Sequence, residues 1–239
     1  MAVGLWRRRR HPRLCRAGPV LLVASLGHDR QPTPGRGGFR VLTLRDLPPG
    51  WVISTDDDDD FQPGHELSDD CKSLDERAST EGVAASATSD SMKGPDNQRL
   101  TSDAAVFSTN EDAHRSLDHF REFFSRCSAD FVAQFEEGVR RGAAKDGIVP
   151  SQLQIQTAVS DLGAPPAGES GLVFRIGGTV SGPSGSFDFA VDFIAIRIGR
   201  MDAALVYTQI GGLRPEEEQA IAQIAAAKLQ IANTMLPEA

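Results

Sequence analysis

Alternating hydrophobic positions are clearest between Phe187 and Ile210, where the sequence reads FDFAVDFIAIRIGRMDAALVYTQI. The pattern predicts two β-strands joined at Gly199-Arg200, because glycine in the first place of a two-residue connection suits a type II′ turn. One face of this hairpin then carries the pairs Arg197/Asp202, Ala195/Ala204, Phe193/Val206, Val191/Thr208 and Phe189/Ile210. The other face carries Ile198/Met201, Ile196/Ala203, Ile194/Leu205 and Asp192/Tyr207. Near the turn both faces are apolar, so we expect the hairpin at the centre of a sheet that is covered on both sides.

The same register predicts one polar contact on an otherwise apolar face. Arg197 lies opposite Asp202, and opposite charges directly across two strands attract each other. We therefore expect a cross-strand ion pair between these two side chains.

Two amphipathic helices supply the covers that such a sheet needs. Thr109 with Asp112 forms a capping box for the first helix, with Asn110 as the alternative cap. Helical spacing then continues to about Lys145 in a stripe made of Ala113, Leu117, Phe120, Phe124, Cys127, Phe131, Phe135 and Val139. A second helix begins at Pro215, the first helical position, with three glutamates behind it where the positive end of the helix favours carboxylates.

Weaker patterns complete the sheet. Strands are predicted over 83–92, 100–108, 152–159 and 172–180, separated by segments rich in glycine, proline and serine. The segment from Arg40 to Leu44 opens the folded part, and Trp51 is expected to cap one edge of the core. The prediction is an α+β fold, a twisted antiparallel sheet covered by helices on both faces, in a single domain over residues 40–235.

The N-terminal 39 residues differ in character from this domain. Residues 1–40 hold nine arginines and one aspartate, a net charge of +8, so the overall −8 leaves −16 on the rest of the chain. A basic block from Arg7 to Arg16, a short apolar run from Ala17 to Leu26 and a polar stretch follow the order of a secretory signal and tether. A disordered basic tail is the alternative, and about ten apolar residues are too few to span a bilayer.

Composition and charge indicate which classes of partner this protein is not expected to bind. The acidic body would repel phosphate backbones, and an aromatic content of 6% gives few rings for stacking on bases, so nucleic acid is not expected as a partner. Residues 56–76 begin with five consecutive aspartates and form an acidic loop. Alternate aspartates imitate the start of an EF-hand, but Phe61 stands where glycine is needed and Leu67 where glutamate is needed, so no calcium site is predicted.

Three cysteines are too few for a disulfide scaffold, but two of them lie in the body of the chain. Cys127 on the helical stripe is either a small buried core residue or one half of a bridge to Cys71. The bridge would tie the acidic loop onto the helix, and it requires a location outside the reducing cytosol.

No catalytic or metal-binding constellation emerges from the residues. The segment Gly182-Pro183-Ser184-Gly185-Ser186 has its glycines misplaced for a hydrolase elbow and lies between two strands. His114 and His119 are five residues apart on one helix, which points them in different directions. Glu169 and Asp161 are expected on loops without a general-acid context. We therefore expect no enzyme activity, no cofactor and no metal.

Several segments in the same order carry a family resemblance. They are LTLRDLPPGW (42–51), SDAAVFSTNEDAHRSLDHFREFFSRC (102–127), Gly168-Glu169-Ser170 and VDFIAIRIGRMDAALVYTQIGG (191–212). Together they resemble secreted actinobacterial domains related to the extracellular sensor domain of the kinase PknH and to LpqN-type lipoproteins. The resemblance covers about residues 40–232 and implies a PsbP-like α/β/α sandwich outside the cytoplasmic membrane. It also implies binding or sensing without catalysis, and disulfides for which Cys71 and Cys127 are the positions at hand.

This chain departs from that family in three ways. It has no kinase domain, His28 stands where a lipobox would place cysteine, and Glu169 replaces an expected aspartate. No ligand motif can be carried over, so the ligand-binding residues stay unknown.

Three functions compete at this point. The first is an exported ligand-binding or sensor-like module at the cell envelope, with a small or lipidic ligand in a groove between sheet and helices and with peripheral membrane association allowed. The second is a structural or interaction protein that docks an envelope protein through the acidic loop without a small ligand. The third is a hydrolase with a divergent motif. A cavity beneath the long helix would favour the first, a solid core with an acidic face the second, and clustered Ser, His and Asp the third.

Overall fold

A computed structural model describes residues 42–54, 67–145, 147–183 and 185–236. In these residues an open antiparallel sheet of eight strands is combined with three α-helices. The strands are β1 (Val52–Ile53), β2 (Val83–Thr88), β3 (Met92–Lys93), β4 (Arg99–Phe107), β5 (Gln154–Gly163), β6 (Ser170–Gly182), β7 (Gly185–Ile198) and β8 (Met201–Ile210). The helices are α1 (Asp69–Thr80), α2 (Asn110–Lys145) and α3 (Pro215–Thr234), with short 3-10 turns η2 (Leu44–Asp46) and η3 (Pro150–Gln152).

The predicted hairpin is the centre of the sheet. The strand order is β1-β3-β4-β8-β7-β6-β5, and β2 pairs with β4 beyond β3, so β7 and β8 have neighbours on both sides. Every expected pair in the hairpin is observed, from Phe189 opposite Ile210 to Ile198 opposite Met201. Gly199 has a φ of 56°, the left-handed conformation that the first place of a type II′ turn requires and that glycine adopts without steric cost.

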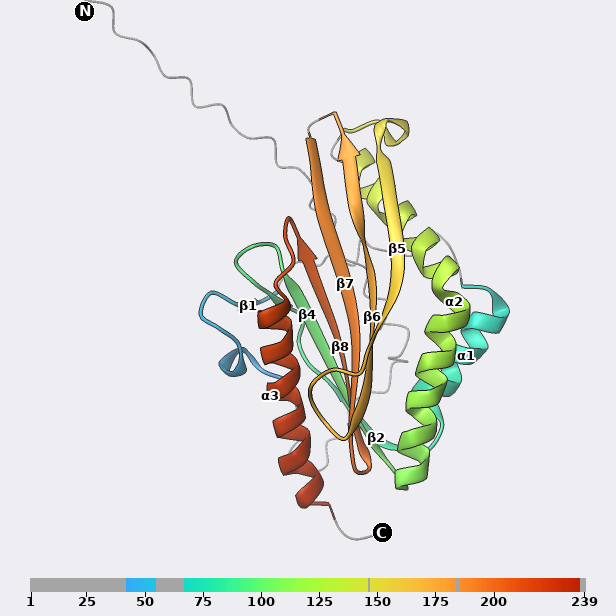
Figure 1. Cartoon of the computed structure of the whole chain (residues 1–239), viewed down its shortest axis with the longest axis vertical. Helices are drawn as coiled ribbons and strands as arrows, with labels where there is room; N and C mark the ends of the chain where they lie inside the picture. The colour runs from blue at the N-terminus through green and yellow to red at the C-terminus, as the bar shows by residue number, and fades with distance from the viewer. Residues whose placement is uncertain (1–41, 55–66, 146, 184, 237–239) are drawn as a thin grey trace, which may run out of the picture.

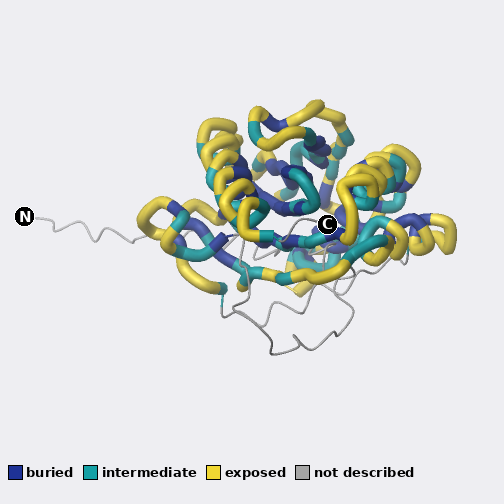
Figure 2. Tube along the Cα trace, turned by 90° about the horizontal axis from the view of Figure 1, so that it is seen from below, coloured by how far each residue is buried: buried dark blue, intermediate teal, exposed yellow. Residues whose placement is uncertain are grey.

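The two covers lie on opposite faces, as the hydrophobic pattern predicted (Figure 1). α2 packs on the face that carries Phe189, Val191 and Phe193, and α3 packs on the face that carries Ile194 and Ile196. α3 runs back along the hairpin, so its first turn lies near the end of β8 and its last turn lies beside the Gly199-Arg200 turn. Along both long helices buried residues turn toward the sheet while exposed residues line the outer side (Figure 2). The fold class is therefore the predicted one.

Thr109 caps α2 as predicted, and Asp112 contributes through its contact with the Thr109 hydroxyl. The backbone N of Asp112 donates to Oγ1 of Thr109 at 3.0 Å, and that hydroxyl donates to Oδ2 of Asp112 at 2.8 Å. The predicted stripe is buried, except that Phe120 is only half-buried. The stripe missed Phe123, which is 5% exposed because α1 packs over that side of α2. The buried face of α2 is thus wider than its sequence periodicity indicated.

α1 is the element that the sequence analysis missed. Residues 69–80 form a helix rather than part of an acidic loop, and Cys71 lies in its first turn. Cys71 and Cys127 are joined in a disulfide with a Cα–Cα distance of 5.8 Å, so the bridge links two helices and not a loop to a helix. The first turn of α1 is polar and serine- and aspartate-rich, so only Cys71 and Leu74, the residues buried against α2, mark its inner side.

The ion pair expected between Arg197 and Asp202 does not form. Arg197 and Asp202 lie opposite each other in the register. The Arg197 guanidinium is directed along the sheet instead, where Nε donates to Oγ of Ser170 at 2.9 Å and Nη1 donates to the Gly199 carbonyl at 2.9 Å. Oδ1 of Asp202 is buried without a hydrogen-bond partner. The sequence could not show that the start of β6 and the hairpin turn offer Arg197 these competing partners.

Some predictions fall on residues outside the described ranges. These are the signal-like segment and tether over 1–39, the aspartates at 56–60 and Ser184. Among the described helices, none combines the length and apolarity that a membrane span needs.

Candidate functional site

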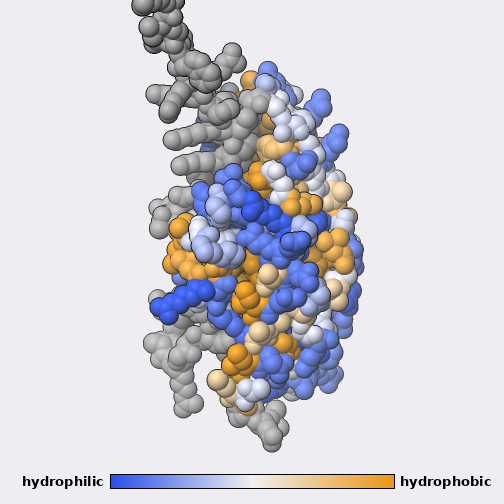
Figure 3. All heavy atoms as spheres, turned by 60° about the vertical axis from the view of Figure 1, so that its left-hand side comes forward, coloured by the Kyte–Doolittle hydropathy of each residue, from blue (hydrophilic) through white to orange (hydrophobic). Residues whose placement is uncertain are grey.

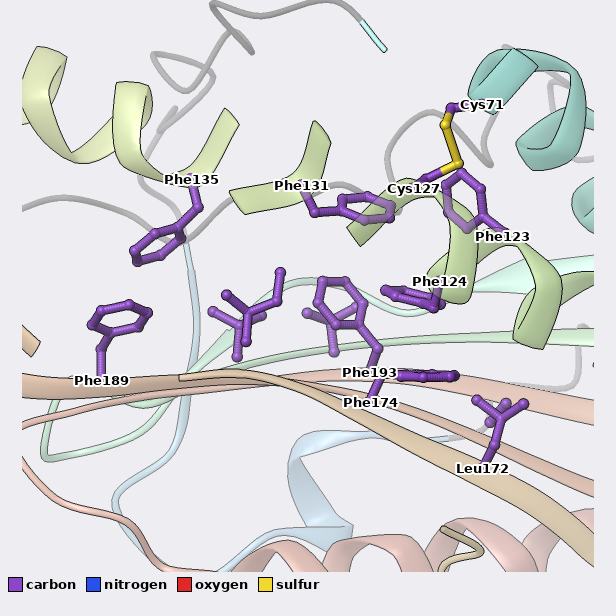
Figure 4. Close-up of a cluster of buried hydrophobic side chains, with 14 of the residues drawn as sticks. Cys71, Phe123, Phe124, Cys127, Phe131, Phe135, Leu172, Phe174, Phe189 and Phe193 are labelled. Carbon is purple, nitrogen blue, oxygen red and sulfur yellow. A yellow bond between two sulfur atoms is a disulfide. The ribbon is translucent and has the colours of Figure 1, made fainter. Parts of the chain in front are cut away.

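The layer between α2 and the sheet is filled by phenylalanine rings (Figure 4). Phe124 of α2 lies 5.1 Å from Phe174 and 4.7 Å from Phe193, measured between ring centroids. Phe135 stacks on Phe189 at 4.3 Å. Rings at these separations are in direct contact, so the long helix has no groove along these rings. Close aromatic packing therefore fills this part of the space between the sheet and the helices, in which a ligand groove was expected.

A row of polar side chains crosses the opposite face of the sheet, under the first turn of α3. Ser160 of β5 pairs with Arg175 of β6, Arg175 pairs with Asp192 of β7, and Asp192 pairs with Tyr207 of β8. The pairing of Asp192 with Tyr207 is the one that the sequence predicted. These residues lie where the apolar core under α3 ends and Glu218 approaches from the helix.

Asp192, Arg175 and Glu218 form the centre of this row. Arg175 donates from Nε to Oδ1 of Asp192 at 2.6 Å and from Nη2 to Oδ2 at 2.9 Å, a bidentate pair. Nη2 also donates to Oε2 of Glu218 at 2.9 Å. The Asp192 side chain is fully buried, that of Glu218 is 12% exposed and that of Arg175 is 20% exposed. One guanidinium thus serves two buried carboxylates; we call these three residues the acid–arginine cluster.

Two carboxylates and one guanidinium lie together in this cluster, and this imbalance of charge affects the pKa of Glu218. Burial raises the pKa of Glu218 to about 7, and the negative charge of Asp192 raises it further than Arg175 can lower it back. The hydrogen bond and charge of Asp192 raise the pKa of Arg175, so the guanidinium stays charged. Near neutral pH the Glu218 carboxyl therefore exchanges between its protonated and ionised forms.

A second set of contacts surrounds the cluster at the start of α3. Glu217 accepts hydrogen bonds from Nε1 of Trp51 at 3.2 Å and from Nε2 of Gln98 at 3.1 Å. Trp51 stacks on Tyr207 with ring centroids 6.3 Å apart, and it is 7% exposed. Trp51 thus caps the core at the β1 edge, as predicted, and it also fixes the first turn of α3.

Two buried donors at this site lack a well-formed hydrogen bond to the described residues, although the Tyr207 hydroxyl lies near enough to Glu217 for that carboxylate to act on it. They are the hydroxyl of Tyr207 and Nε2 of Gln209, on side chains that are 0% and 1% exposed. Oε1 of Gln209 accepts from the backbone N of Arg214, which places the amide beside the start of α3. Burial and the nearby charge of Glu217 raise the pKa of Tyr207, so its hydroxyl keeps its proton. Figure 3 shows hydrophilic side chains across the middle of the face on the side of α3 and β1.

The α2 face carries a different buried acid. Burial raises the pKa of Asp202 to about 7, and Arg197 and the Ser116 hydroxyl only partly oppose this shift. Asp103, on the neighbouring strand, also has its pKa raised by burial. These acids lie beneath the first turns of α2, away from the acid–arginine cluster.

The residues tested for chemistry in the sequence do not come together. Glu169 serves the hairpin turn, since Oε2 accepts from the Gly199 backbone N at 3.1 Å and lies 3.4 Å from Nη2 of Arg197. Asp161 lies on β5 rather than on a loop. In the described ranges no three His, Cys, Asp or Glu side chains are grouped so that they could hold a metal ion.

The acid–arginine cluster was not identified as a site from the sequence, although two features of the sequence point to it. Asp192 is the only charged residue in the otherwise apolar run from Phe189 to Ile196, and three glutamates open α3. Pairing of Asp192 with Arg175 depends on the register between β6 and β7, and contact with Glu218 depends on where α3 docks.

No family model matches the chain, and no curated protein matches it. Among solved structures, the extracellular domain of PknH from Mycobacterium tuberculosis is similar, with a TM-score of 0.40, 11% sequence identity, 77% of this chain covered and 79% of that one. It is one of the two domain types that the sequence segments resemble. A likeness of this degree does not establish a shared function.

Proposed function

We propose that this protein is an exported, non-catalytic ligand-binding or sensor-like module at the cell envelope. The Cys71–Cys127 disulfide supports the location, because such bridges persist in oxidising compartments and are rare in the cytosol. The proposal includes a single sensor-like domain over residues 40–235.

The proposed binding role rests on the buried donors of Tyr207 and Gln209 on the α3 face. A buried polar group without a hydrogen bond costs about 1–3 kcal/mol, so Tyr207 and Gln209 favour a molecule that brings acceptor oxygens to them. Glu217 and Glu218 beside them accept hydrogen bonds, and Arg175 donates them. A small hydroxylated molecule or a lipid headgroup offers both kinds of group, so the proposed ligand is polar at the end that enters.

Native mass spectrometry of the protein isolated from its own host tests this proposal. We expect a bound small molecule, and a protein mass that is two hydrogens lower than that of the reduced chain. The double variant Tyr207→Phe, Gln209→Leu should lose the molecule, whereas Leu213→Ala, a change at a side chain that is 50% exposed, should retain it. A folded, oxidised protein that carries no ligand, or whose ligand survives the double variant, would contradict the proposed site.

The alternative is docking of an envelope protein through residues 56–76, without a small ligand. The ring packing beneath α2 favours it, because a filled layer there is the outcome expected for a docking protein. Asp69 and Asp70 favour it too, because both are exposed in the first turn of α1 and the disulfide fixes this helix on α2. Crosslinking in intact cells should then capture a defined partner with the wild-type protein and not with Asp69→Lys, Asp70→Lys. Peripheral association with the membrane stays a prediction, to be tested by cell fractionation.

A further inference from the structure

Polar contacts of Glu217 and Glu218 hold the first turn of α3 to the sheet. Glu217 accepts hydrogen bonds from the neutral donors of Trp51 and Gln98, and Glu218 accepts one from Arg175. Below Glu218 the apolar core ends, and its contacts are made to side chains that carry or can gain a charge. The groups that face Glu218 are Arg175 from β6, Asp192 from β7 and Tyr207 from β8. Beside it in α3 and its cap, Glu217 and Arg214 pair with each other.

The number of charges at this contact does not balance when both acids are ionised. Arg175 already makes a bidentate pair with Asp192, which is fully buried and cannot move into solvent. Glu218 shares Nη2 of the same guanidinium and, at 12% exposed, lies at the edge of the site. Arg214 does not restore the balance, since it faces Glu217 and Asp96. An ionised Glu218 is therefore the group that repulsion from Asp192 would drive outward.

We propose that Asp192, Arg175 and Glu218 form a proton-controlled clasp, which holds the first turn of α3 against the sheet when Glu218 is protonated and releases it when Glu218 ionises. This device extends beyond ligand binding, and it does not require the ligand proposed for Tyr207 and Gln209.

The direction of the effect follows from proton linkage. Glu218 has a pKa of about 7 when α3 is docked, against 4.5 for a free glutamate, so the docked state binds the proton more tightly. Docking is therefore fully favoured below about pH 4.5 and loses that advantage as the pH rises through 7. A difference of this size corresponds to a change of up to about 300-fold in the docking equilibrium.

Trp51 provides a natural reporter of docking. Its Nε1 donates to Glu217 in the same turn of α3, and its ring is buried on Tyr207. The chain has one other tryptophan, Trp6, so Trp6→Phe leaves Trp51 as the only source of tryptophan fluorescence. We expect the emission of Trp51 to shift to longer wavelength between pH 6 and 8.5, with a midpoint near 7.

Two variants test whether ionisation of Glu218 causes the shift in Trp51 emission. Glu218→Gln keeps an acceptor for Arg175 and cannot ionise, so it mimics the protonated acid and should abolish the shift. Asp202→Asn removes the other acid whose pKa is about 7, on the α2 face, and should leave the shift intact. A shift that survives Glu218→Gln, or one that Asp202→Asn abolishes, overturns the proposal.

Amide hydrogen exchange in the Trp6→Phe chain gives a second reading that needs no variant of the cluster. After correction for the intrinsic pH dependence of exchange, residues 218–222 should lose protection by up to about tenfold between pH 6 and 8.5, the part of the linkage that falls in this window. The second half of α3 should change little. Unchanged protection in the first turn would refute release. Because no ligand is added, failure here leaves the ligand-binding proposal standing, and absence of a ligand leaves the clasp standing.

Discussion

The disulfide between α1 and α2 should be the largest single stabilising feature outside the core. We expect that the double variant Cys71→Ala, Cys127→Ala folds but is far less stable than the wild type. The bridge joins residues 56 positions apart, so it restricts a long loop of the unfolded chain. α1 has little else to hold it, since only Cys71, Leu74 and Asp75 are buried in its 12 residues.

The magnitude follows from loop closure. A cross-link that closes a loop of this length removes chain entropy worth about 4 kcal/mol at 25 °C. Cys127 is 1% exposed and Cys71 is 6% exposed, so alanine also leaves a small cavity in the core. With a urea dependence of about 2 kcal/mol per molar, the midpoint of unfolding should fall by roughly 2 M.

Urea unfolding followed by circular dichroism measures this difference. Cys15→Ala is the matched control, because it removes the third cysteine and leaves the bridge. Since a cross-link is lost only once, Cys71→Ala alone should be destabilised nearly as much as the double variant. If the double variant loses less than about 1 kcal/mol, or if the single-variant losses add up, the entropic reasoning is wrong.

Three further predictions concern the sheet and its covers. Burial raises the pKa of Asp202 to about 7, so the native state keeps a proton that the unfolded chain loses above about pH 4. The free energy of unfolding therefore falls as the pH rises from 4 to 7. Urea unfolding at pH 8 should show that Asp202→Asn raises this free energy by up to about 4 kcal/mol. Phe131→Ala should cost about 3–5 kcal/mol because this ring is fully buried, whereas Phe120→Ala, at a half-buried position, should cost clearly less in the same assay. Gly178→Ala should lower the melting temperature strongly, since its Cβ would lie 1.8 Å from a backbone carbonyl oxygen of β5, and Gly212→Ala, where nothing lies within 4 Å, should not.

The proposed clasp and the behaviour of Asp202 point in the same direction. Both acids bind a proton more tightly in the folded state, so the protein should be more stable at pH 5 than at pH 8. They lie on opposite faces of the sheet, so each can be removed without touching the other. The pH dependence of stability in the two single variants separates their contributions.

The sequence by itself determined the centre of this protein. The apolar pattern from Phe187 to Ile210 predicts two strands, and the two-residue turn at Gly199-Arg200 fixes which residues of β7 and β8 pair. Apolar residues on both faces then required two covers, and the stripes on α2 and α3 supplied them. Such local periodicity is visible without knowing any partner.

Tertiary structure decided the rest, because those features depend on contacts between segments far apart in the chain. α1 has too few apolar positions to be recognised as a helix, and it is buried only where Cys71 and Leu74 meet α2. Arg197 faces Asp202 in the register, yet its guanidinium donates to Ser170 at the start of β6. The acid–arginine cluster forms only when β6 pairs with β7 and the first turn of α3 docks above them, which places two carboxylates on one guanidinium away from water.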